Sequence, residues 1–429
     1  MVYWLYSLAL SVAAVAAAPY WVWRGLRDGK YLHSFVRRLG WRLPDQPRPA
    51  GPVWIHAVSV GEVLAAKPLI AALRAQRPDI GVVVSTVTLS GQALAHKELA
   101  AAAAGVFYFP FDWDWSVRRY LDRVAPRAVI LMETELWPNF LKGCARRRVP
   151  VALANARLSD RSRRRLRRIP RLIRTMLSQV AVIAAQTHED RRRFVDLGAD
   201  ARRVHVTGNV KFDFAPPDAA QHRAVVESIR ARLAAGGTEP IIVVGSSMKG
   251  EERLFIDALK SLRAQLPAAR MILAPRHPER FDEVARLLSE SSVPFVRRSS
   301  GNGDAAGGPQ VLLLDSIGEL RAVYALASVA VIGGSFLPPH GGHNLLEPAA
   351  LGKAIVFGPQ MSNFGEMARM FLREQAARQC SPEQLPRALA ELLENPRARD
   401  LLGHRALSTF RQNQGATRAT VDLVSPHLG

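Results

Sequence analysis

Short runs of β-branched and other apolar residues alternate along this chain with spans that are long enough for a helix. Parallel strands are buried on both faces, so they appear as continuous apolar runs, and a helix usually connects each strand to the next. Such runs form a first series at 53–57, 82–84, 128–131, 151–153 and 182–184, and a second at 241–244, 271–273, 311–314, 329–332 and 355–357. The alternation predicts an α/β protein with two doubly wound, Rossmann-like domains that face a cleft.

The interval between the two series indicates the domain boundary. A chain of 429 residues is long enough for two separate cores. Residues 214–220 contain the pair Pro216-Pro217, which is typical of a linker. We therefore expect a first domain over 24–213 and a second over 221–429, whose C-terminal helices pack back on the first.

Positive charge is concentrated in the first half of the chain. The formal net charge is +21; residues 1–213 contain 34 Lys and Arg against 16 Asp and Glu, a net of +18, and the remainder contains 24 against 21, a net of +3. A strongly cationic half indicates an anionic partner, which can be a nucleic acid, an acidic membrane or a phosphorylated substrate. Cys144 and Cys380 are far apart and the histidines form no cluster, so the sequence predicts neither a disulfide nor a metal site.

The first 23 residues carry no charged side chain. A helix of this length is about 34 Å long and could cross a hydrocarbon core of about 30 Å. Tyr and Trp residues stand at both ends of the segment, and Arg24 and Arg27 follow it, which is typical of a membrane anchor with the rest of the chain in the cytoplasm. The sequence predicts an anchor over 1–23; a cleaved signal peptide and an interfacial or re-entrant helix are the alternatives.

Charged residues follow several strands of the first series, at the edge where open α/β sheets bind ligands. Glu62 stands near a helix start, where it could accept a proton from a hydroxyl or only charge the first turn. Glu133 and Glu135 follow another strand, and nearby carboxylates would raise the pKa of Glu62. Arg157 and Lys211 could stabilise negative charge on a leaving phosphate, or form ordinary surface ion pairs.

Residues 161–174 contain eight arginines, with apolar residues at helical spacing between them. The pattern predicts one basic amphipathic helix, which would bind an anionic membrane or an acidic acceptor. The residues expected to make that contact are Arg163, Arg164, Arg167 and Arg168. A solvated helix face is the alternative. Nucleic acid is not expected as the partner, because no aromatic platform or recognition module accompanies the arginines.

Glycine pairs at 333–334 and 341–342 follow the strand at 329–332, and a short helix is expected to begin near Leu345. Glycines let backbone N–H groups approach a phosphate, and a helix N-terminus adds partial positive charge. Glu347, one turn into the helix, could bind a ribose diol, and Arg276 could bind a phosphate. The pattern predicts a nucleotide site, while the lack of a G-x-x-x-x-G-K-[ST] loop argues against a P-loop NTPase.

Seven motifs stand in order: S-V-G-E at 59–62, E-T-E-L-W-P at 133–138, N-A-R-L-S at 155–159, G-N-V-K-F-D at 208–213, A-P-R-H-P at 274–278, G-G-S-F at 333–336 and G-G-H-N-x-x-E-P at 341–348. In this combination the chain resembles, over nearly its whole length, the 3-deoxy-D-manno-octulosonic acid (Kdo) transferases of Gram-negative lipopolysaccharide synthesis. The resemblance implies the GT-B glycosyltransferase fold, no bound metal and no cofactor. It also implies transfer of Kdo from CMP-Kdo to a lipid A precursor at the cytoplasmic face of the inner membrane.

The resemblance further implies roles for individual residues. Glu62 corresponds to the general base, and Glu133 and Lys211 to positions that support the transition state. The implied CMP-binding residues are Pro275, Arg276, Ile317, Gly318, Glu319, Asn344, Leu345, Leu346 and Glu347. A GT-B enzyme that uses a UDP-sugar would share the fold and the ribose-binding glutamate, and is the main alternative.

This chain departs from the family pattern in three loops. Ser247-Met248 stands where Thr-His is common, and Ser90-Gly91 where Thr-Gly is common. The loop at 337–340 is one residue longer than the pattern. These differences affect the expected loop contacts to the nucleotide rather than the expected reaction.

Overall fold

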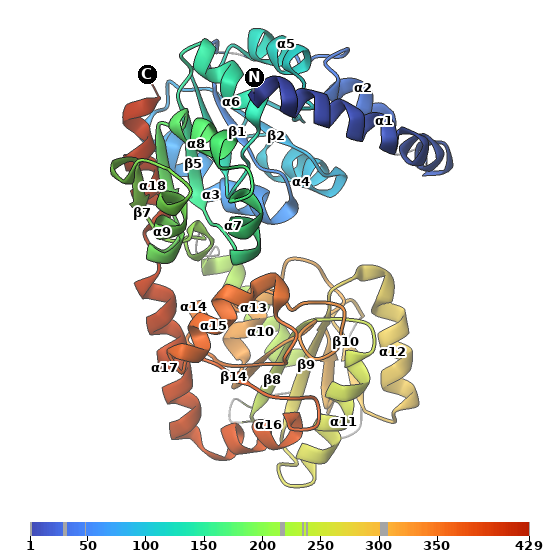
Figure 1. Ribbon diagram of the computed structural model, residues 1–429. Coiled ribbons are helices and arrows are strands. Elements are labelled where there is room, and N and C mark those ends of the chain that lie inside the picture. Colours follow the sequence, from blue (N-terminus) through green and yellow to red (C-terminus); the bar gives the residue numbers. More distant parts are fainter. Residues whose placement is uncertain are drawn as a thin grey trace. The chain divides into compact units, whose positions relative to one another are not determined.

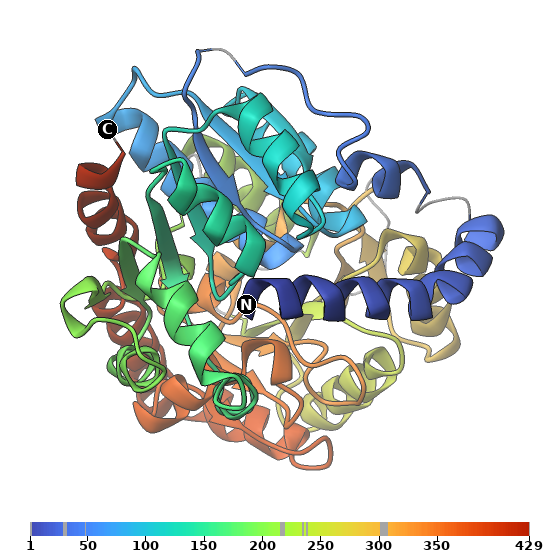
Figure 2. The same ribbon diagram turned by 45° about the horizontal axis from the view of Figure 1, so that its top comes forward.

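The computed structural model describes residues 2–428 except 29–31, 48, 215–218, 234–235, 237–238 and 301–307. The chain divides into two compact units, one formed by Met1–Ala215 with Asn413–Gly429 and the other by Pro216–Gln412. Each unit contains one seven-stranded parallel sheet with helices on both faces (Figures 1 and 2). The predicted α/β class with two Rossmann-like domains is confirmed.

The first sheet has the strand order β3-β2-β1-β4-β5-β6-β7. Its strands are β1 Val53–His56, β2 Val82–Thr86, β3 Gly105–Tyr108, β4 Ala128–Met132, β5 Val151–Ala156, β6 Val182–Ala185 and β7 Val204–Val206. The sequence did not predict the two edge strands β3 and β7, each of which is only partly buried; in β7 a histidine also interrupts the apolar run. The strand order reverses between β1 and β4, and ligands bind at the carboxyl ends of strands at such a switch point.

Helices cover both faces of this sheet. They are α1 Val2–Asp28, α2 Leu32–Arg38, α3 Val60–Gln76, α4 Leu89–Leu99, α5 Asp114–Val124, α6 Pro138–Arg146, α7 Asp160–Leu166, α8 Pro170–Ser178, α9 His188–Asp196 and α18 Ala416–Val424. Alternate β1 residues face opposite cores: Trp54 packs with α5, α6, α8 and α9, whereas Val53 and Ile55 pack with α3, α4 and α18. This alternation follows from the two-residue period of a strand.

The second sheet has the order β10-β11-β9-β8-β12-β13-β14. Its strands are β8 Ile241–Ser247, β9 Arg270–Pro275, β10 Phe295–Arg297, β11 Val311–Leu313, β12 Val329–Ile332, β13 Ala354–Phe357 and β14 Arg378–Gln379. Its helices are α10 Ala219–Arg232, α11 Glu251–Arg263, α12 Phe281–Glu290, α13 Leu320–Val323, α14 Leu346–Ala350, α15 Gly365–Arg373, α16 Leu385–Glu394 and α17 Pro396–Gln412. The short edge strands β10 and β14 were again not predicted, because they carry arginines instead of an apolar run.

The boundaries differ from those expected in two places. Helix α10 begins at Ala219, so the last two residues of the expected linker 214–220 are helical, and 215–218 lie outside the described residues. The second unit ends at Gln412 rather than at residue 429, because α18 packs on α3 and β6 of the first unit (Figure 1). Asp213 fixes this return of the chain, since its carboxylate accepts the backbone N–H of Gly415 at 2.7 Å and of Thr417 at 2.5 Å.

The single basic helix predicted over 161–174 is wrong. The structure has two helices there, α7 and α8, because Pro170 cannot continue a helix and instead takes the first position of α8. In α8, Ile173 and Met176 are buried in the core, and in α7 no residue is fully buried. The arginines at 161–168 therefore lie on the protein surface, in the short helix α7 and in the turn that follows it.

The predicted N-terminal helix is present and extends to Asp28, beyond the expected end at residue 23. Among the described residues, one helix is long and apolar enough to cross a membrane, over Tyr3–Tyr20.

We expect Asp213→Ala to loosen α18. Loss of an N-terminal cap typically costs about 1–2 kcal/mol, because two backbone N–H groups lose a charged acceptor. Hydrogen exchange of the amides in α18 should then accelerate. Arg418→Ala is the matched control, since this side chain lies on the same helix and is 90% exposed. Equal exchange in both variants would show that Asp213 does not hold the helix.

Candidate functional site

Glu62 lies in the first turn of α3, directly after the carboxyl end of β1. Its carboxylate accepts the backbone N–H of Val58 at 2.9 Å and the hydroxyl of Ser59 at 3.2 Å, so it also fixes the turn that leads into the helix. The side chain is largely buried. Burial raises the pKa of Glu62 to about 7, and the nearby charges of Glu133 and Glu135 act in the same direction. Glu62 can therefore exchange a proton near neutral pH.

Glu133 follows β4 and has a different environment. Its carboxylate forms ion pairs with the Nε of Arg157 at 2.7 Å and the Nζ of Lys211 at 3.1 Å. The three side chains were expected separately at the sheet edge, and the structure brings them together. Two cations therefore bind Glu133, whereas the carboxylate of Glu62 accepts hydrogen bonds from neutral donors only. Of these two carboxyl groups, Glu62 has the environment of a general base, and Glu133 holds two cations in place.

Backbone geometry at the strand ends positions these side chains. Glu133 has φ of 55° and Asn155 has φ of 54°, a left-handed backbone conformation that residues other than glycine rarely adopt. The side-chain oxygen of Asn155 accepts the backbone N–H of Val210 at 3.1 Å, and Asn209 caps the turn that carries Lys211. Asn155 is thus a positioning residue. In the sequence Asn155 opens the N-A-R-L-S motif at 155–159, but no role was predicted for it.

In the second unit, the carboxylate of Glu251 organises the glycine loop that follows β12. Glu251 is fully buried, and it accepts the backbone N–H groups of Met248 at 3.0 Å, Gly334 at 2.6 Å and Phe336 at 2.9 Å. Burial raises the pKa of Glu251, against the opposing effect of these three donors. A Cβ atom at Gly333 would lie 2.5 Å from the carbonyl oxygen of Ser246, so only glycine fits there. The sequence did not single out Glu251.

Asn344 and Glu347 lie at the N-terminus of α14, one residue later than expected for the helix start. The side chain of Asn344 accepts the backbone N–H of Leu346 at 3.0 Å and donates to Glu347 at 3.2 Å. Burial raises the pKa of Glu347, while Asn344 and the charges of Arg321 and Arg276 oppose that shift. Arg276 itself is exposed, and its backbone N–H donates to Ser247. The structure thus places Arg276 close enough to Glu347 for their charges to interact.

The other predicted nucleotide-binding residues differ in accessibility. The side chains of Leu345 and Leu346 are buried in the core, as is Pro275, so these residues could offer only backbone groups to a ligand. Ile317 is 75% exposed, and Gly318 has φ of +92° with open space beside it.

The carboxylate of Glu319 forms an ion pair with Arg298 at 2.8 Å. It also accepts the hydroxyl of Ser316. Arg298 and Ser316 lower the pKa of Glu319, and the carboxylate is ionised at neutral pH. Its side chain is therefore better suited to fixing the 316–319 turn than to binding a ligand.

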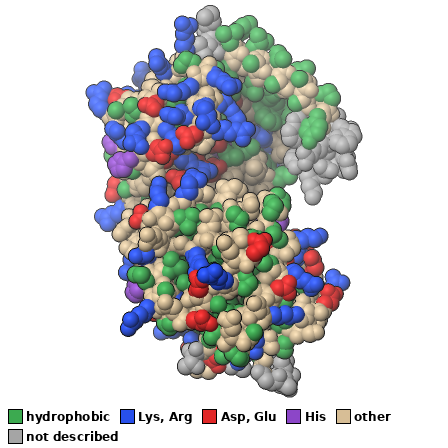
Figure 3. All heavy atoms as spheres, turned by 60° about the horizontal axis from the view of Figure 1, so that its bottom comes forward, with side chains coloured by type: hydrophobic (Ala, Val, Ile, Leu, Met, Phe, Trp, Pro, Cys, Tyr) green, Lys and Arg blue, Asp and Glu red, His purple; other side chains and the backbone are tan. Residues whose placement is uncertain are grey.

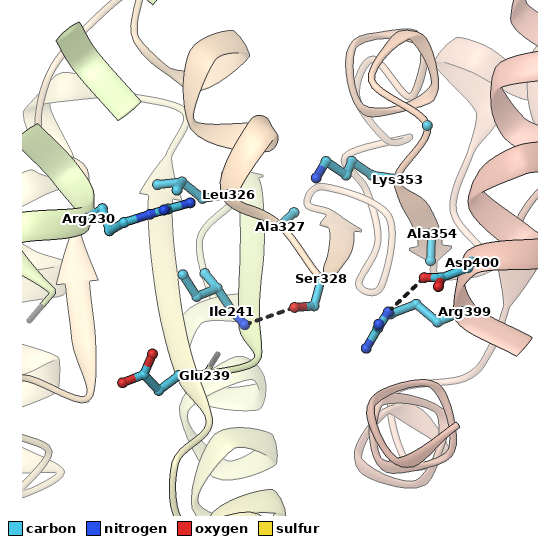
Figure 4. A pocket seen from close by; sticks show the side chains of 11 residues that line it. Arg230, Glu239, Ile241, Leu326, Ala327, Ser328, Lys353, Ala354, Arg399 and Asp400 are labelled. Carbon is cyan, nitrogen blue, oxygen red and sulfur yellow. Dashed lines mark hydrogen bonds and ion pairs between the residues drawn. The ribbon is translucent and has the colours of Figure 1, made fainter. Parts of the chain in front are cut away.

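A cavity of about 280 Å³ lies at the amino ends of β8, β12 and β13, away from all seven motifs (Figure 4). Arg230, Lys353 and Arg399 line it, together with Glu239 and Asp400. The opposite charges largely compensate one another, and ligands of parallel sheets bind at the carboxyl ends of strands. The cavity is therefore not the nucleotide site. No group of three or more His, Cys, Asp or Glu that could hold a metal occurs among the described residues.

Comparison with known proteins shows which family this chain is similar to. A family model described as 3-deoxy-D-manno-octulosonic-acid transferase matches residues 33–214. The 3-deoxy-D-manno-octulosonic acid transferase of Haemophilus influenzae is 36% identical over 94% of this chain and 93% of its own length. The enzyme of the same name from Bordetella pertussis is 36% identical over 95% of this chain and 96% of its own.

Solved structures agree on the fold. The UDP-GlcNAc 2-epimerase from Neisseria meningitidis superposes with a TM-score of 0.59 over 87% of this chain and 100% of its own, at 13% sequence identity. At that identity the likeness concerns the two-domain GT-B-like architecture alone.

We expect Glu251→Ala to destabilise the second unit by at least about 3 kcal/mol, because three buried backbone N–H groups would lose their acceptor. Glu251→Gln keeps the shape and one acceptor oxygen, so its loss should be smaller. Urea denaturation, with hydrogen exchange of residues 333–336, measures both effects. Glu283→Ala is the control, since this carboxylate is exposed. A stability equal to that of the control would contradict the role assigned to Glu251.

Proposed function

Because the chain belongs to the 3-deoxy-D-manno-octulosonic-acid (Kdo) transferase family, glycosyltransferases of lipopolysaccharide biosynthesis, we propose that it transfers Kdo from CMP-Kdo to a lipid A precursor at the cytoplasmic face of the inner membrane. The observation that carries this proposal is Glu62, a buried carboxyl group with a pKa of about 7 at the carboxyl edge of a Rossmann-like sheet. Such a group is suited to deprotonating an acceptor hydroxyl at neutral pH.

In the proposed reaction the first unit activates the acceptor. Glu62 takes the proton of the acceptor hydroxyl, whose oxygen attacks the anomeric carbon of Kdo. The bond between that carbon and the phosphate oxygen breaks, and its electron pair leaves with CMP, so the configuration at the anomeric carbon inverts. Lys211 and Arg157, held by Glu133, supply positive charge for the developing negative charge. With these cations present, the reaction would require no bound metal.

The second unit would hold the donor. Arg276 is exposed and would bind the CMP phosphate, while Asn344 presents Glu347 to the ribose hydroxyls. Leu345, Leu346 and Pro275 would contribute backbone groups and shape. The segment Ile317, Gly318 and Glu319 would approach the cytosine through its exposed turn, which Arg298 fixes through Glu319.

The basic surface of the first unit would bind the phosphorylated acceptor and the anionic leaflet. Figure 3 shows Lys and Arg side chains gathered on the face of this unit that the view presents. Arg163 is partly buried and pairs with Asp160 and Asp196. Within the described part of the chain, by contrast, the exposed side chains of Arg164, Arg167 and Arg168 form no ion pair or hydrogen bond. These three are therefore better suited to binding phosphate than Arg163 is.

We expect Glu62→Gln to lower kcat by about 10²- to 10⁴-fold while CMP affinity is unchanged, because the variant cannot accept a proton. In the wild type, kcat/KM should rise with pH through about 7, as Glu62 loses its proton. The assay is product formation from CMP-Kdo and lipid A precursor in detergent. Glu189→Gln is the matched control, an exposed carboxylate of the same unit. Near-normal turnover of Glu62→Gln would remove Glu62 as the base.

The same substitution should stabilise the protein at high pH. The folded-state pKa of Glu62 is about 7, above its ordinary value of 4.5, so the folded state binds a proton more tightly and loses stability as pH rises between those values. The cost is on the order of 3 kcal/mol above pH 7. Glu62→Gln should therefore raise Tm at pH 8 and change it little at pH 4.5. No difference between the two pH values would contradict the raised pKa.

For the donor site, we expect Arg276→Ala and Glu347→Ala each to weaken CMP binding by roughly 10- to 150-fold, the usual effect of losing one charged hydrogen bond. Isothermal titration calorimetry measures this, and UDP and UMP in the same cell test the preference for the cytidine nucleotide. Arg373→Ala, an arginine on α15, is the control. Unchanged CMP affinity in both site variants would place the donor elsewhere, and tighter UDP binding would favour a UDP-sugar enzyme.

A further inference from the structure

One face of α1 is hydrogen-bonded to the first unit. The hydroxyl of Tyr3 accepts from the side chain of Gln179 at 2.8 Å, and the hydroxyl of Ser7 accepts from Asn139 at 2.9 Å. One turn further, the hydroxyl of Ser11 accepts the indole N–H of Trp113 at 3.1 Å. These three residues are spaced four apart, so they share one face of the helix, and α1 packs with that face on α6 and α8 (Figures 1 and 2).

The opposite face of α1 is apolar and exposed. Its side chains are Trp4, Leu5, Leu8, Val12 and Val15, with exposed fractions between 47% and 74%. Contiguous apolar surface of this kind is rare on a soluble protein and marks a contact with a protein or a membrane.

The hydrogen bonds of α1 argue against a membrane-spanning orientation. A span over Tyr3–Tyr20 would place Tyr3, Ser7 and Ser11 in the hydrocarbon together with the elements bonded to them. Those elements carry charge: the Nζ of Lys142 lies 5.2 Å from the Tyr3 ring and 3.4 Å from the carboxylate of Asp114. Charged side chains in the hydrocarbon are costly, so a spanning helix would have to give up these contacts.

A chain of aromatic rings continues the apolar surface beyond α1. The Phe35 and Phe111 ring centroids are 5.2 Å apart, those of Phe111 and Trp113 5.5 Å, and those of Trp113 and Trp115 6.4 Å. The indole N–H of Trp113 also donates to Ser11 of α1, so the ring series adjoins the helix. Phe35 and Trp115 are exposed. Tryptophan is enriched where a protein meets the headgroup region of a bilayer.

Unpaired cations stand beside this surface. Arg37, Arg42 and Arg119 are exposed, and over the part of the chain that the structure describes their side chains form no ion pair. Arg42 directly follows Trp41 in the chain, and Trp41 is 64% exposed. Basic residues beside an aromatic and aliphatic surface complement a bilayer that contains anionic lipids.

We propose that α1 lies in the plane of the membrane surface instead of crossing the bilayer. Its outer face and the ring series Phe35–Phe111–Trp113–Trp115 enter one leaflet, and its inner face stays bonded to the first unit. Both ends of α1 are then on the same side of the membrane as the two units. This proposal concerns how the helix meets the bilayer and does not depend on the transfer reaction.

Side-specific labelling tests the orientation. A cysteine is added before Met1 of the full chain. Spheroplasts and inverted inner-membrane vesicles that contain this variant are then each treated with a membrane-impermeant maleimide. We expect labelling in inverted vesicles only, as for the control Arg397→Cys on the exposed surface of α17. The native thiols should not react, because Cys144 and Cys380 are buried. Labelling of the N-terminal cysteine in intact spheroplasts would show a spanning helix and overturn the proposal.

Vesicle binding tests the contact face. For the purified full chain and phosphatidylglycerol vesicles, we expect Leu5→Glu and Val12→Glu each to lower the partition coefficient at least tenfold, which corresponds to about 1.4 kcal/mol. Leu401→Glu is the matched control, because Leu401 is exposed to the same degree as Leu5 but lies on α17 of the second unit. Circular dichroism checks that each variant is folded. Partition equal to that of the control would show that the outer face of α1 does not contact lipid.

Discussion

Within each unit, buried carboxylates that accept backbone N–H groups fix the loops between strands and helices. Glu251 accepts three such groups and fixes the glycine loop after β12. Asp112 accepts the N–H groups of Asn139 and Phe140 and so fixes the start of α6. Helix N-termini leave N–H groups without partners, and a buried carboxylate satisfies several of them at once. The functional side chains depend on these junctions, since they stand on the same turns.

Glu62 is also such a carboxylate, and the proposed reaction gives it a second role. It accepts the backbone N–H of Val58 in the turn before α3, yet it lacks the cations that bind Glu133. Burial without a counter-charge disfavours the ionised form of Glu62 and so raises its pKa. The ionised carboxylate costs folding stability, but a pKa near neutrality suits a general base. The sequence left open whether Glu62 charges the first turn of a helix or acts as a base, and its position in the first turn of α3 is compatible with the proposed base.

The central strands and the motif residues could be predicted because each is encoded locally. An apolar run marks a buried strand, and the residues after it fall at the sheet edge. The edge strand β7 could not be found in this way, since only its first residue is fully buried. The break at Pro170 was missed because apolar residues kept helical spacing across it. Asn155 and Glu251 act through contacts with residues distant in sequence, and no local pattern reveals those contacts.

The return of the chain to its first unit has a consequence for biosynthesis. Ala416, Val421 and Val424 of α18 belong to the core that also contains Val53 and Ile55 of β1. During translation, the part of this core that α18 covers therefore stays open until the last residues have left the ribosome, although α3 and α4 already cover the rest. The N-terminal unit cannot complete its core before the second unit has been synthesised. A ribosome that stops after Gln412 would release a chain with part of this hydrophobic core exposed, which chaperones and proteases recognise.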